Sequence, residues 1–318
     1  MILERQLSFV FGAGVNFRNR LYDQGTLKAR ELAGPVVSVG GISVGGAGKT
    51  PFTILLGELL KARGIQFDIL SRGYRRSTTG AVVVDPSGSA RTSGDEPLLM
   101  ARGLGVPVVV GEDRYEAGLL AEKTHGVRLH LLDDGFQHRR LNRQFDIALV
   151  TPEDLQDRLL PGGRLREPLT GLLRADAVVA IGDIDNQELP PGIKAAWQSR
   201  RSLARIYAPP RPVVFCGIAR PQRFLDQLHE QGITPVALEV YRDHHPYSEA
   251  NVKHLLRMRD RRKAGGFITT EKDAINLGPL IEHLQPVVIA QVEMTLQDPG
   301  RCLDFMLQML RARGKPAS

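Results

Sequence analysis

Residues 36–50 read VVSVGGISVGGAGKT, an apolar run that stops at a glycine-rich segment closed by Gly48, Lys49 and Thr50. An amphipathic, helix-like pattern follows in residues 52–60. A strand, a glycine-rich turn, Lys-Thr and a helix make up a phosphate-binding loop (P-loop), whose backbone N–H groups and helix N-terminus bind phosphates. The lysine of such a loop reaches the β- and γ-phosphates, and the threonine hydroxyl binds Mg²⁺. The stretch therefore predicts a nucleoside triphosphate site.

The strict P-loop pattern has a glycine at its first position, where this chain has Ser43. The alternative is a glycine-rich turn that binds nothing, but the adjoining strand, Lys-Thr pair and helix favour the nucleotide site. The residues expected to surround the phosphates are Ser43, Val44, Gly45, Gly46, Ala47, Gly48, Lys49 and Thr50.

Composition narrows the class of protein further. The 318 residues carry a formal net charge of +7, and the excess is mostly arginine, which suits recognition of phosphates. No nucleic-acid-binding motif accompanies the basic runs, and a solvated face is the alternative for each run. Cys216 and Cys302 lie far apart without a Cys/His cluster, so neither a disulfide framework nor a zinc site is indicated, which fits a reducing cytoplasm. We expect no signal peptide and no membrane-spanning helix.

The first thirty residues have a pattern of their own. Apolar residues recur at helical spacing from Leu3 through Leu7, Val10 and Phe17 to Leu21. The pattern predicts an amphipathic helix that either packs on its own domain or lies in a membrane interface. From the residues alone the packed helix is slightly favoured, although Gly12 and Gly14 weaken the helix prediction.

The remainder alternates short β-rich runs with helical patterns, which predicts an α/β fold with a mostly parallel sheet flanked by helices. The Pro- and Arg-rich stretch 190–212 interrupts the alternation. We therefore expect an N-terminal helix in 1–30, a P-loop core in 31–208 and a smaller C-terminal α/β domain in 209–318. Within the last domain, PVVIAQVEM (286–294) has the pattern of one strand.

Three short motifs contain candidate chemical groups. RLHLLDDG (128–135) ends an apolar strand on Asp133 and Asp134, where a P-loop enzyme needs a carboxylate for Mg²⁺; the alternative is a hairpin turn. TSGDEPLLMA (92–101) resembles a helix start with a Ser93–Glu96 capping box, which leaves Asp95 as a candidate base. YRDHHPY (241–247) contains His244, for which the default interpretation is a polar surface loop.

The motifs taken together resemble the tetraacyldisaccharide 4'-kinases, the lipid A 4'-kinases. The resemblance covers nearly the whole chain, and its most specific parts are SVGGAGKTP (43–51) and LLDDGFQHRRL (131–141). It also includes LSRGYRR (70–76), GDEPLLMA (94–101), GEDRYEAG (111–118), GRLREP (163–168), FCGIARPQRF (215–224), DHHPY (243–247) and TTEKDA (269–274).

The resemblance implies transfer of the γ-phosphate of ATP, with Mg²⁺, to the 4'-hydroxyl of a tetraacylated glucosamine disaccharide 1-phosphate, giving lipid IVA in lipid A biosynthesis. It implies a peripheral protein at the cytoplasmic face of the bacterial inner membrane. The N-terminal helix would then contact the anionic membrane surface. Neither a nucleic acid nor a protein partner is expected.

By the same resemblance, Lys49 and Thr50 would hold phosphates and Mg²⁺, and Asp133 and Asp134 would complete the metal site. Asp95 with His244 would deprotonate the sugar hydroxyl. Positions similar to family residues near the nucleotide or the lipid headgroup are Arg72, Glu96, Arg114, Gln137, His138, Arg166 and Lys272. The chain departs from the family at Gly41, where Asn is frequent, and at Ala47, where Thr is frequent.

Two other classes of function stay open on the residues alone. One is a soluble P-loop enzyme that acts on a small metabolite, of the dethiobiotin synthetase type. The other is a nucleotide-switched binding protein that hydrolyses ATP to change its shape.

Overall fold

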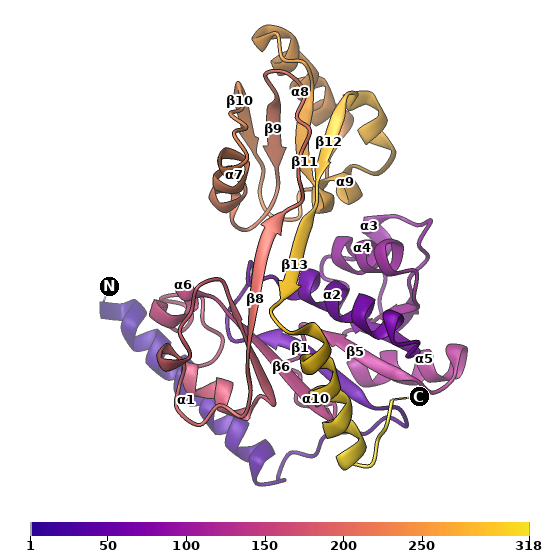
Figure 1. Cartoon of the computed structure of the whole chain (residues 1–318), viewed down its shortest axis with the longest axis vertical. Helices are drawn as coiled ribbons and strands as arrows, with labels where there is room; N and C mark the ends of the chain where they lie inside the picture. Colours follow the sequence, from indigo (N-terminus) through magenta and orange to yellow (C-terminus); the bar gives the residue numbers. More distant parts are fainter. Residues whose placement is uncertain (1, 318) are drawn as a thin grey trace.

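A computed structural model of the chain describes residues 2–317. These residues form two α/β units that are stacked along the long axis of the molecule (Figure 1). The larger unit contains a nine-stranded sheet and the smaller unit a four-stranded sheet. The P-loop lies in the larger unit, where that unit faces the smaller one.

The nine-stranded sheet is parallel except at its two edges, where each outermost strand pairs with its neighbour in antiparallel fashion. Its central strands are buried along their whole length, as the near-continuous apolar runs predict. In spatial order the strands are β13 (Val292–Leu296), β8 (Ala196–Leu203), β7 (Ala177–Ile181), β6 (Phe145–Val150), β1 (Val36–Gly41), β5 (Leu129–Asp133), β2 (Phe67–Ser71), β4 (Val108–Val110) and β3 (Val82–Val83).

Helices cover both faces of this sheet, and α2 begins at the P-loop. The apolar stripe of α2 buries Phe52, Leu56 and Leu60 in the main core, so the helix N-terminus is held at the carboxyl end of β1. The helical segments of this unit are α1 (Ile2–Asp23), α2 (Lys49–Ala62), α3 (Ala90–Ser93), α4 (Asp95–Leu104), α5 (Arg114–His125), α6 (Pro152–Gln156), η1 (Leu169–Arg174), η2 (Asn186–Glu188) and α10 (Pro299–Ala312).

The smaller unit is an all-parallel sheet with its own cores. Its strands in spatial order are β10 (Ala237–Val240), β9 (Val213–Cys216), β11 (Phe267–Thr270) and β12 (Val287–Ala290). Its helical segments are α7 (Pro221–Glu230), α8 (Glu249–Arg262), α9 (Glu271–Leu277) and η3 (Gly278–Leu284). The predicted fold class, a P-loop core with a second α/β unit, is confirmed by this topology.

The predicted division of the chain differs from the structure at its C-terminal end. The chain enters the smaller unit after β8 and returns to the larger one at β13, so residues 292–312 belong to the larger unit and not to the second domain. The segment 286–294 is consequently two strands in two sheets, and the prediction of one strand is wrong. β8 and β13 pair as a two-stranded ribbon that connects the units (Figure 1). The chain is held in the larger unit after its return by Leu303 and Met306 of α10, which are buried in the main core of that unit.

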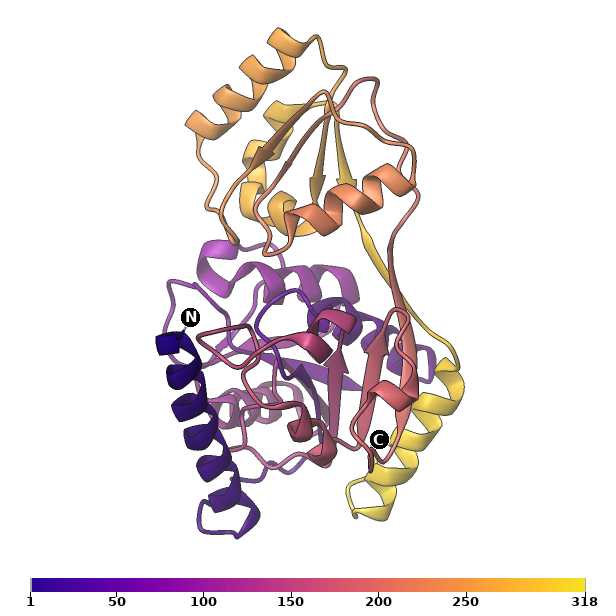
Figure 2. The same cartoon turned by 90° about the vertical axis from the view of Figure 1, so that its left-hand side faces the viewer.

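The N-terminal helix α1 lies along the outside of the larger unit, on the side opposite α10 (Figure 2). It is attached through a polar face: Ser8 Oγ donates to the Leu159 carbonyl oxygen at 2.8 Å, and Asn19 Nδ2 donates to Glu167 Oε2 at 2.9 Å. Gly12 is buried at this contact, where a Cβ atom would lie only 2.7 Å from Leu159 Cδ1, so a larger residue would not fit. Gly12 therefore serves helix packing. None of the helices within residues 2–317 combines the length and the apolar character that a bilayer span requires.

Candidate active site

The P-loop of the structure depends on its glycines. Gly45, Gly46 and Gly48 have φ values of 58°, 77° and 81°, which L side chains rarely adopt. Arg164 fixes the loop from outside, since its Nη2 atom donates to the carbonyl oxygens of Val44 at 2.7 Å and Gly45 at 2.8 Å. These contacts leave the N–H groups at the start of α2 directed at the position where a phosphate would bind.

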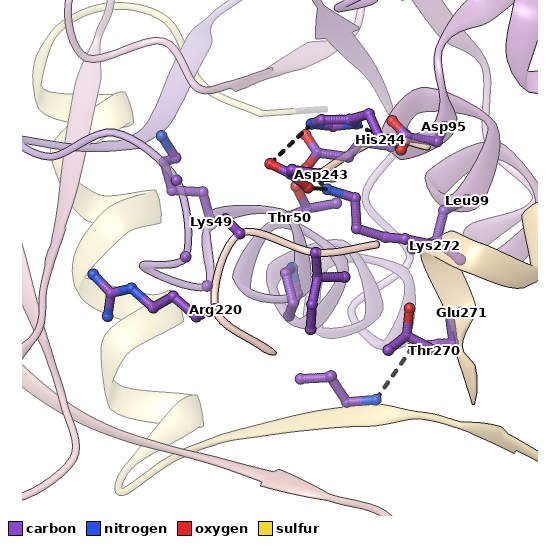
Figure 3. Close-up of a pocket in the computed structure, with 18 of the residues that line it drawn as sticks. Lys49, Thr50, Asp95, Leu99, Arg220, Asp243, His244, Thr270, Glu271 and Lys272 are labelled. Atoms are coloured by element: carbon purple, nitrogen blue, oxygen red, sulfur yellow. Dashed lines mark hydrogen bonds and ion pairs between the residues drawn. The ribbon is translucent and has the colours of Figure 1, made fainter. Parts of the chain in front are cut away.

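A cavity of about 460 Å³ lies between the two units, and the P-loop forms one of its walls. Figure 3 shows that Lys49 and Arg220 lie on one side of it and Asp95, His244 and Lys272 on another. Of the predicted site residues, the cavity is lined by Val44, Gly45, Gly46, Gly48, Lys49, Thr50, Arg72, Asp95, Glu96, Asp133, Asp134, Arg166, His244 and Lys272. Ser43, Ala47, Arg114, Gln137 and His138 do not line it.

Asp134 is the centre of a charged cluster at the carboxyl end of β5. It receives Lys49 Nζ at 2.6 Å and a two-pronged contact from Arg166, with Nη2 2.7 Å from Oδ1 and Nη1 3.1 Å from Oδ2. Burial opposes ionisation of Asp134, but the charges of Lys49 and Arg166 hold its pKa well below the usual range. The carboxylate therefore keeps its negative charge beside the P-loop.

Asp133 has the opposite electrostatic environment. Burial raises its pKa to about 7, and the negative charges of Glu96 and Asp134 add to the effect. Within the described part of the chain, the contacts that reach the carboxylate are weak and come from Thr53 Oγ1 and Ser71 Oγ, both at 3.3 Å. A cation would relieve this cost, so the donor set is suited to a metal ion.

The described residues contain no group of three or more His, Cys, Asp or Glu side chains with the geometry of a metal site. Mg²⁺ typically uses one or two carboxylates together with water and substrate phosphates. Asp133, Asp134 and the Thr50 hydroxyl beside the P-loop match this pattern, and the residues present fit Mg²⁺.

Asp95 and His244 come from different units and meet at the cavity. Asp95 is the first residue of α4, and His244 follows β10 with a φ of 57°. His244 Nδ1 lies 2.7 Å from Asp95 Oδ2, and Asn276 Nδ2 donates to the same oxygen at 3.1 Å. The structure thus brings together two residues that are 149 positions apart in the sequence.

The electrostatics of Asp95 favour its charged form. Burial would raise its pKa, but the hydrogen bond with His244 and the charge of Lys272 outweigh burial and lower the pKa to about 2. Its Oδ1 atom also accepts the backbone N–H of Glu96 at 2.9 Å. With both oxygens engaged, Asp95 can fix the orientation of the His244 ring and stabilise a proton on it.

Glu96 lines the cavity but does not form the predicted capping box. The helix α4 begins after Gly94, which serves as its N-cap without a side-chain hydrogen bond, and Ser93 instead ends α3. The predicted Ser93–Glu96 capping box is therefore wrong. Glu96 Oε1 instead accepts Lys272 Nζ at 2.9 Å across the two units. With Gly94 as the N-cap, Glu96 is the second residue of the helix and not the third, which is the position that a capping box requires.

The predicted residues outside the cavity support it from behind. Gln137 Nε2 donates to the Gly41 carbonyl oxygen at 3.0 Å and to Glu167 Oε1 at 2.9 Å, next to the P-loop strand. Arg114 Nη1 donates to the Glu112 carbonyl oxygen at 3.0 Å. Burial and the charge of Arg114 lower the pKa of His138 to about 4, so His138 is neutral at physiological pH.

Sequence reasoning missed four arginines at the site. Arg164 holds the P-loop, while Arg201, Arg220 and Arg223 line the cavity. Arg164, Arg220 and Arg223 lie within GRLREP and FCGIARPQRF, so those motifs were the available signal. Arg201 had no signal beyond its place in a basic run, because its position depends on how β8 extends between the units.

Known proteins resemble this chain over most of its length. The profile of the family described as Tetraacyldisaccharide-1-P 4'-kinase matches residues 2–311. The chain is 46% identical over 317 residues to the tetraacyldisaccharide 4'-kinase of Koribacter versatilis, covering 96% of this chain and 98% of that protein. It is 38% identical over 288 residues to the protein of the same name from Aquifex aeolicus, covering 85% and 88%.

Among solved structures, LpxK from Aquifex aeolicus in complex with ATP matches with a TM-score of 0.77 and 34% identity, over 96% of this chain and 97% of that one. A match of this extent covers both units and the ribbon between them. The profile, the relatives and the solved structure agree that the chain belongs to the tetraacyldisaccharide-1-P 4'-kinase family.

Proposed function

We propose that the cavity between the two units is where this chain carries out the reaction of its family. That reaction is transfer of the γ-phosphate of ATP to the 4'-hydroxyl of tetraacyldisaccharide 1-phosphate, which gives lipid IVA in lipid A biosynthesis. The observation that carries the proposal is that a P-loop with Lys49 and a partly buried Asp95–His244 pair line one cavity.

The P-loop provides the phosphate site. Backbone N–H groups between Val44 and Thr50 would bind the β-phosphate, and Lys49 would exchange its contact with Asp134 for the γ-phosphate. Thr50, Asp133 and Asp134 would hold Mg²⁺, which when bound neutralises negative charge on the phosphates. Arg166 would remain paired with Asp134 and keep it in place.

The Asp95–His244 pair would remove the proton from the 4'-hydroxyl. A sugar hydroxyl is a poor nucleophile at neutral pH, so a positioned base is needed. Asp95 is ionised, and its carboxylate makes a hydrogen bond with His244 Nδ1. The proton that leaves the hydroxyl would therefore be shared between the carboxylate and the imidazole. The pair joins the two units, so the base is complete only when they are together.

The other charged residues would position these groups. The Lys272–Glu96 contact joins the units next to the base. Arg72 lines the cavity and would meet a phosphate of the nucleotide or the acceptor. Arg114, Gln137 and His138 act from behind the P-loop and β5, and no direct substrate contact is assigned to them.

We also infer that α1 binds the anionic surface at the cytoplasmic face of the inner membrane. The polar face of α1 packs on the protein, and three apolar side chains of the predicted stripe point outward. Leu7, Val10 and Phe17 are 48%, 66% and 65% exposed, and Phe9 is 78% exposed. A contiguous set of exposed large apolar side chains is rare on a fully solvated helix, and arginines on the same helix suit anionic headgroups.

Sedimentation with anionic liposomes tests this membrane proposal. The double variant Val10→Ser/Phe17→Ser should bind liposomes about tenfold or more weakly, because burial of a Phe side chain contributes about 1.5–3 kcal/mol. Its helix content should be unchanged, since both side chains are exposed. Asn16→Ser, another exposed change on α1, is the control. Equal liposome binding by wild type and the double variant would refute a role for the stripe.

Label transfer from γ-labelled MgATP tests the reaction. We expect transfer to tetraacyldisaccharide 1-phosphate and none to the 4'-deoxy acceptor or to small soluble carboxylic acids and amines. Transfer to a soluble metabolite would favour a metabolite enzyme, and acceptor-independent ATP hydrolysis alone would favour a nucleotide switch. No nucleic acid or protein partner enters the proposal.

A further inference from the structure

Three arginines line the cavity close to the P-loop and have no role in the catalytic step described above. Arg201 lies in β8, which continues into the ribbon between the units. Arg220 directly precedes α7, and Arg223 lies in the first turn of that helix. All three line the cavity, one from the ribbon and two from the smaller unit.

These guanidinium groups lack the partners that buried charges normally have. Within residues 2–317, Arg201 and Arg223 have no carboxylate within 4.0 Å, and Arg220 has only long contacts to Glu153 at 3.5 Å and Asp154 at 4.0 Å. Nitrogens of all three are buried without a hydrogen-bond partner: Arg201 Nε, Arg220 Nε and Nη1, and Arg223 Nη1. Most buried side-chain nitrogens in folded proteins have a partner. The paired arginines among the described residues, such as Arg166 and Arg174, leave only Nε without one, so the Nη1 atoms of Arg220 and Arg223 are the ones that indicate a ligand.

The three charges also repel one another. Burial lowers the pKa of Arg201 to about 10, and the charges of Arg223 and Arg220 add to that effect. Like charges buried together cost free energy unless an anion accompanies them. The cluster is therefore matched to an anion that carries several charges.

The cluster abuts the P-loop. A Cβ atom at Gly46 would lie 2.7 Å from Arg220 Nε, and one at Gly48 would lie 3.9 Å from Arg201 Cδ. Gly46 thus allows Arg220 to pack directly on the loop that binds phosphates. The N-terminus of α7 adds to the attraction, because its first N–H groups receive no side-chain cap.

We propose that Arg201, Arg220 and Arg223 form a second binding site for the triphosphate of the donor nucleotide, so that the phosphates are held by both units. The proposal rests on the nucleotide site of the proposed function and extends it. Lys49 and the loop amides hold the phosphates from the larger unit, while Arg220 and Arg223 hold them from the smaller one. Arginine suits this task because its planar group donates two parallel hydrogen bonds to a phosphate. A bound triphosphate would thereby tie α7 to the P-loop.

Equilibrium binding of MgATP and adenosine, without acceptor, tests the proposal in Arg201→Gln and Arg223→Gln. Each variant should weaken MgATP binding about tenfold to a hundredfold and leave adenosine binding within about twofold, because only phosphates are contacted. Arg200→Gln is the matched control: it is the neighbouring residue on β8, its side chain is 83% exposed, and it meets Asp183 only at 3.8 Å. The control should bind MgATP as the wild type does.

Thermal unfolding separates binding from a structural role. Without ligand, Arg201→Gln and Arg223→Gln should have a Tm equal to or above that of the wild type, because repulsion is relieved, while the Tm rise on adding MgATP should shrink. A lowered Tm without ligand, together with normal MgATP affinity, would show that the arginines serve the fold and would overturn the proposal.

The acceptor also carries a phosphate, so its binding is measured with and without the 1-phosphate. Loss of the preference for the phosphorylated acceptor, with MgATP affinity unchanged, would assign the cluster to the lipid and overturn this inference. Normal MgATP binding by both variants of an active kinase would refute the arginine site and leave the proposed function intact. Arginine-dependent MgATP binding by a chain that transfers no phosphate would support the site and refute the proposed function.

Discussion

The contact between Asp95 and His244 gives the sharpest prediction about catalysis. We consider Asp95→Asn, His244→Ala and the double variant. The carboxylate is 4% exposed and accepts hydrogen bonds from His244 Nδ1 at 2.7 Å, Asn276 Nδ2 at 3.1 Å and the Glu96 N–H at 2.9 Å. Two of these three contacts join the smaller unit to the larger one. Either substitution therefore removes the same shared base.

The size of the effect follows from the role of a base. A positioned general base contributes about 10²-fold to 10⁴-fold in rate, so each single variant should lose this factor in kcat. ATP affinity should change little, since neither residue belongs to the P-loop. If the residues act as one unit, the double variant loses little more than the worse single variant, and the coupling free energy is about 2.7–5.5 kcal/mol at 1.36 kcal/mol per tenfold change.

The assay is the initial rate of acceptor phosphorylation at saturating MgATP, with ATP affinity measured separately. His245→Ala is the control, because His245 is adjacent in sequence but stacks on Tyr241 at 4.5 Å and does not line the cavity. The control should keep kcat within a few-fold of the wild type. Losses that add strictly in free energy would show independent roles, and a normal kcat for His244→Ala would remove His244 from the mechanism.

Three further predictions concern the phosphate site and stability. Lys49→Ala should abolish most transfer and weaken MgATP binding, because no loop N–H replaces its charge at the γ-phosphate; near wild-type turnover would refute the P-loop role. Arg313→Ala removes contacts of 2.9 and 2.8 Å to Asp176 that hold the end of α10, so it should lower the free energy of unfolding, measured in urea, by about 1.5 kcal/mol. The control Arg311→Ala changes an exposed side chain and should leave the free energy of unfolding unchanged. Equal effects of the two substitutions would exclude a role for the ion pair. Burial lowers the pKa of His130, but the carboxylates of Asp68 and Glu122 raise it more, so the pKa lies above its ordinary value. The stability from this pairing is thus complete below about pH 6.5 and lost as pH rises through the raised pKa. The Tm advantage of wild type over His130→Gln should shrink from pH 6 to pH 9, and a constant or widening gap would contradict the assignment.

Local motifs predicted the parts of the site that lie close together in the sequence. The P-loop glycines, Lys49 and Asp133 follow the ends of buried parallel strands, and such strands place their carboxyl ends at one edge of a sheet. The order of strand, turn and helix therefore indicated the nucleotide wall without a structure. The alternation of short strands and helices likewise indicated the α/β class.

Features that depend on distant contacts were not predictable from local pattern. The apolar run 286–294 has the pattern of one strand, and only tertiary pairing shows that Ala290 ends one sheet and Val292 joins another. The spacing of Ser93 and Glu96 matches the pattern of a capping box, but in the structure the carboxylate of Glu96 accepts a hydrogen bond from Lys272 of the other unit. From the sequence alone, the apolar stripe on α1 is the face expected to pack on the protein. In the structure, Gly12 and the polar residues beside it make the packing contact.

In the proposed reaction, phosphate passes from the P-loop to a hydroxyl held by the Asp95–His244 pair between the two units. The most direct measurement is a crystal structure of the chain with Mg²⁺, an unreactive ATP analogue and tetraacyldisaccharide 1-phosphate. We expect the 4'-oxygen to lie within about 3.2 Å of Asp95 or His244 and in line with the γ-phosphate beside Lys49. A 4'-oxygen that lies outside the cavity, or that faces the γ-phosphate with neither Asp95 nor His244 in contact, would contradict it.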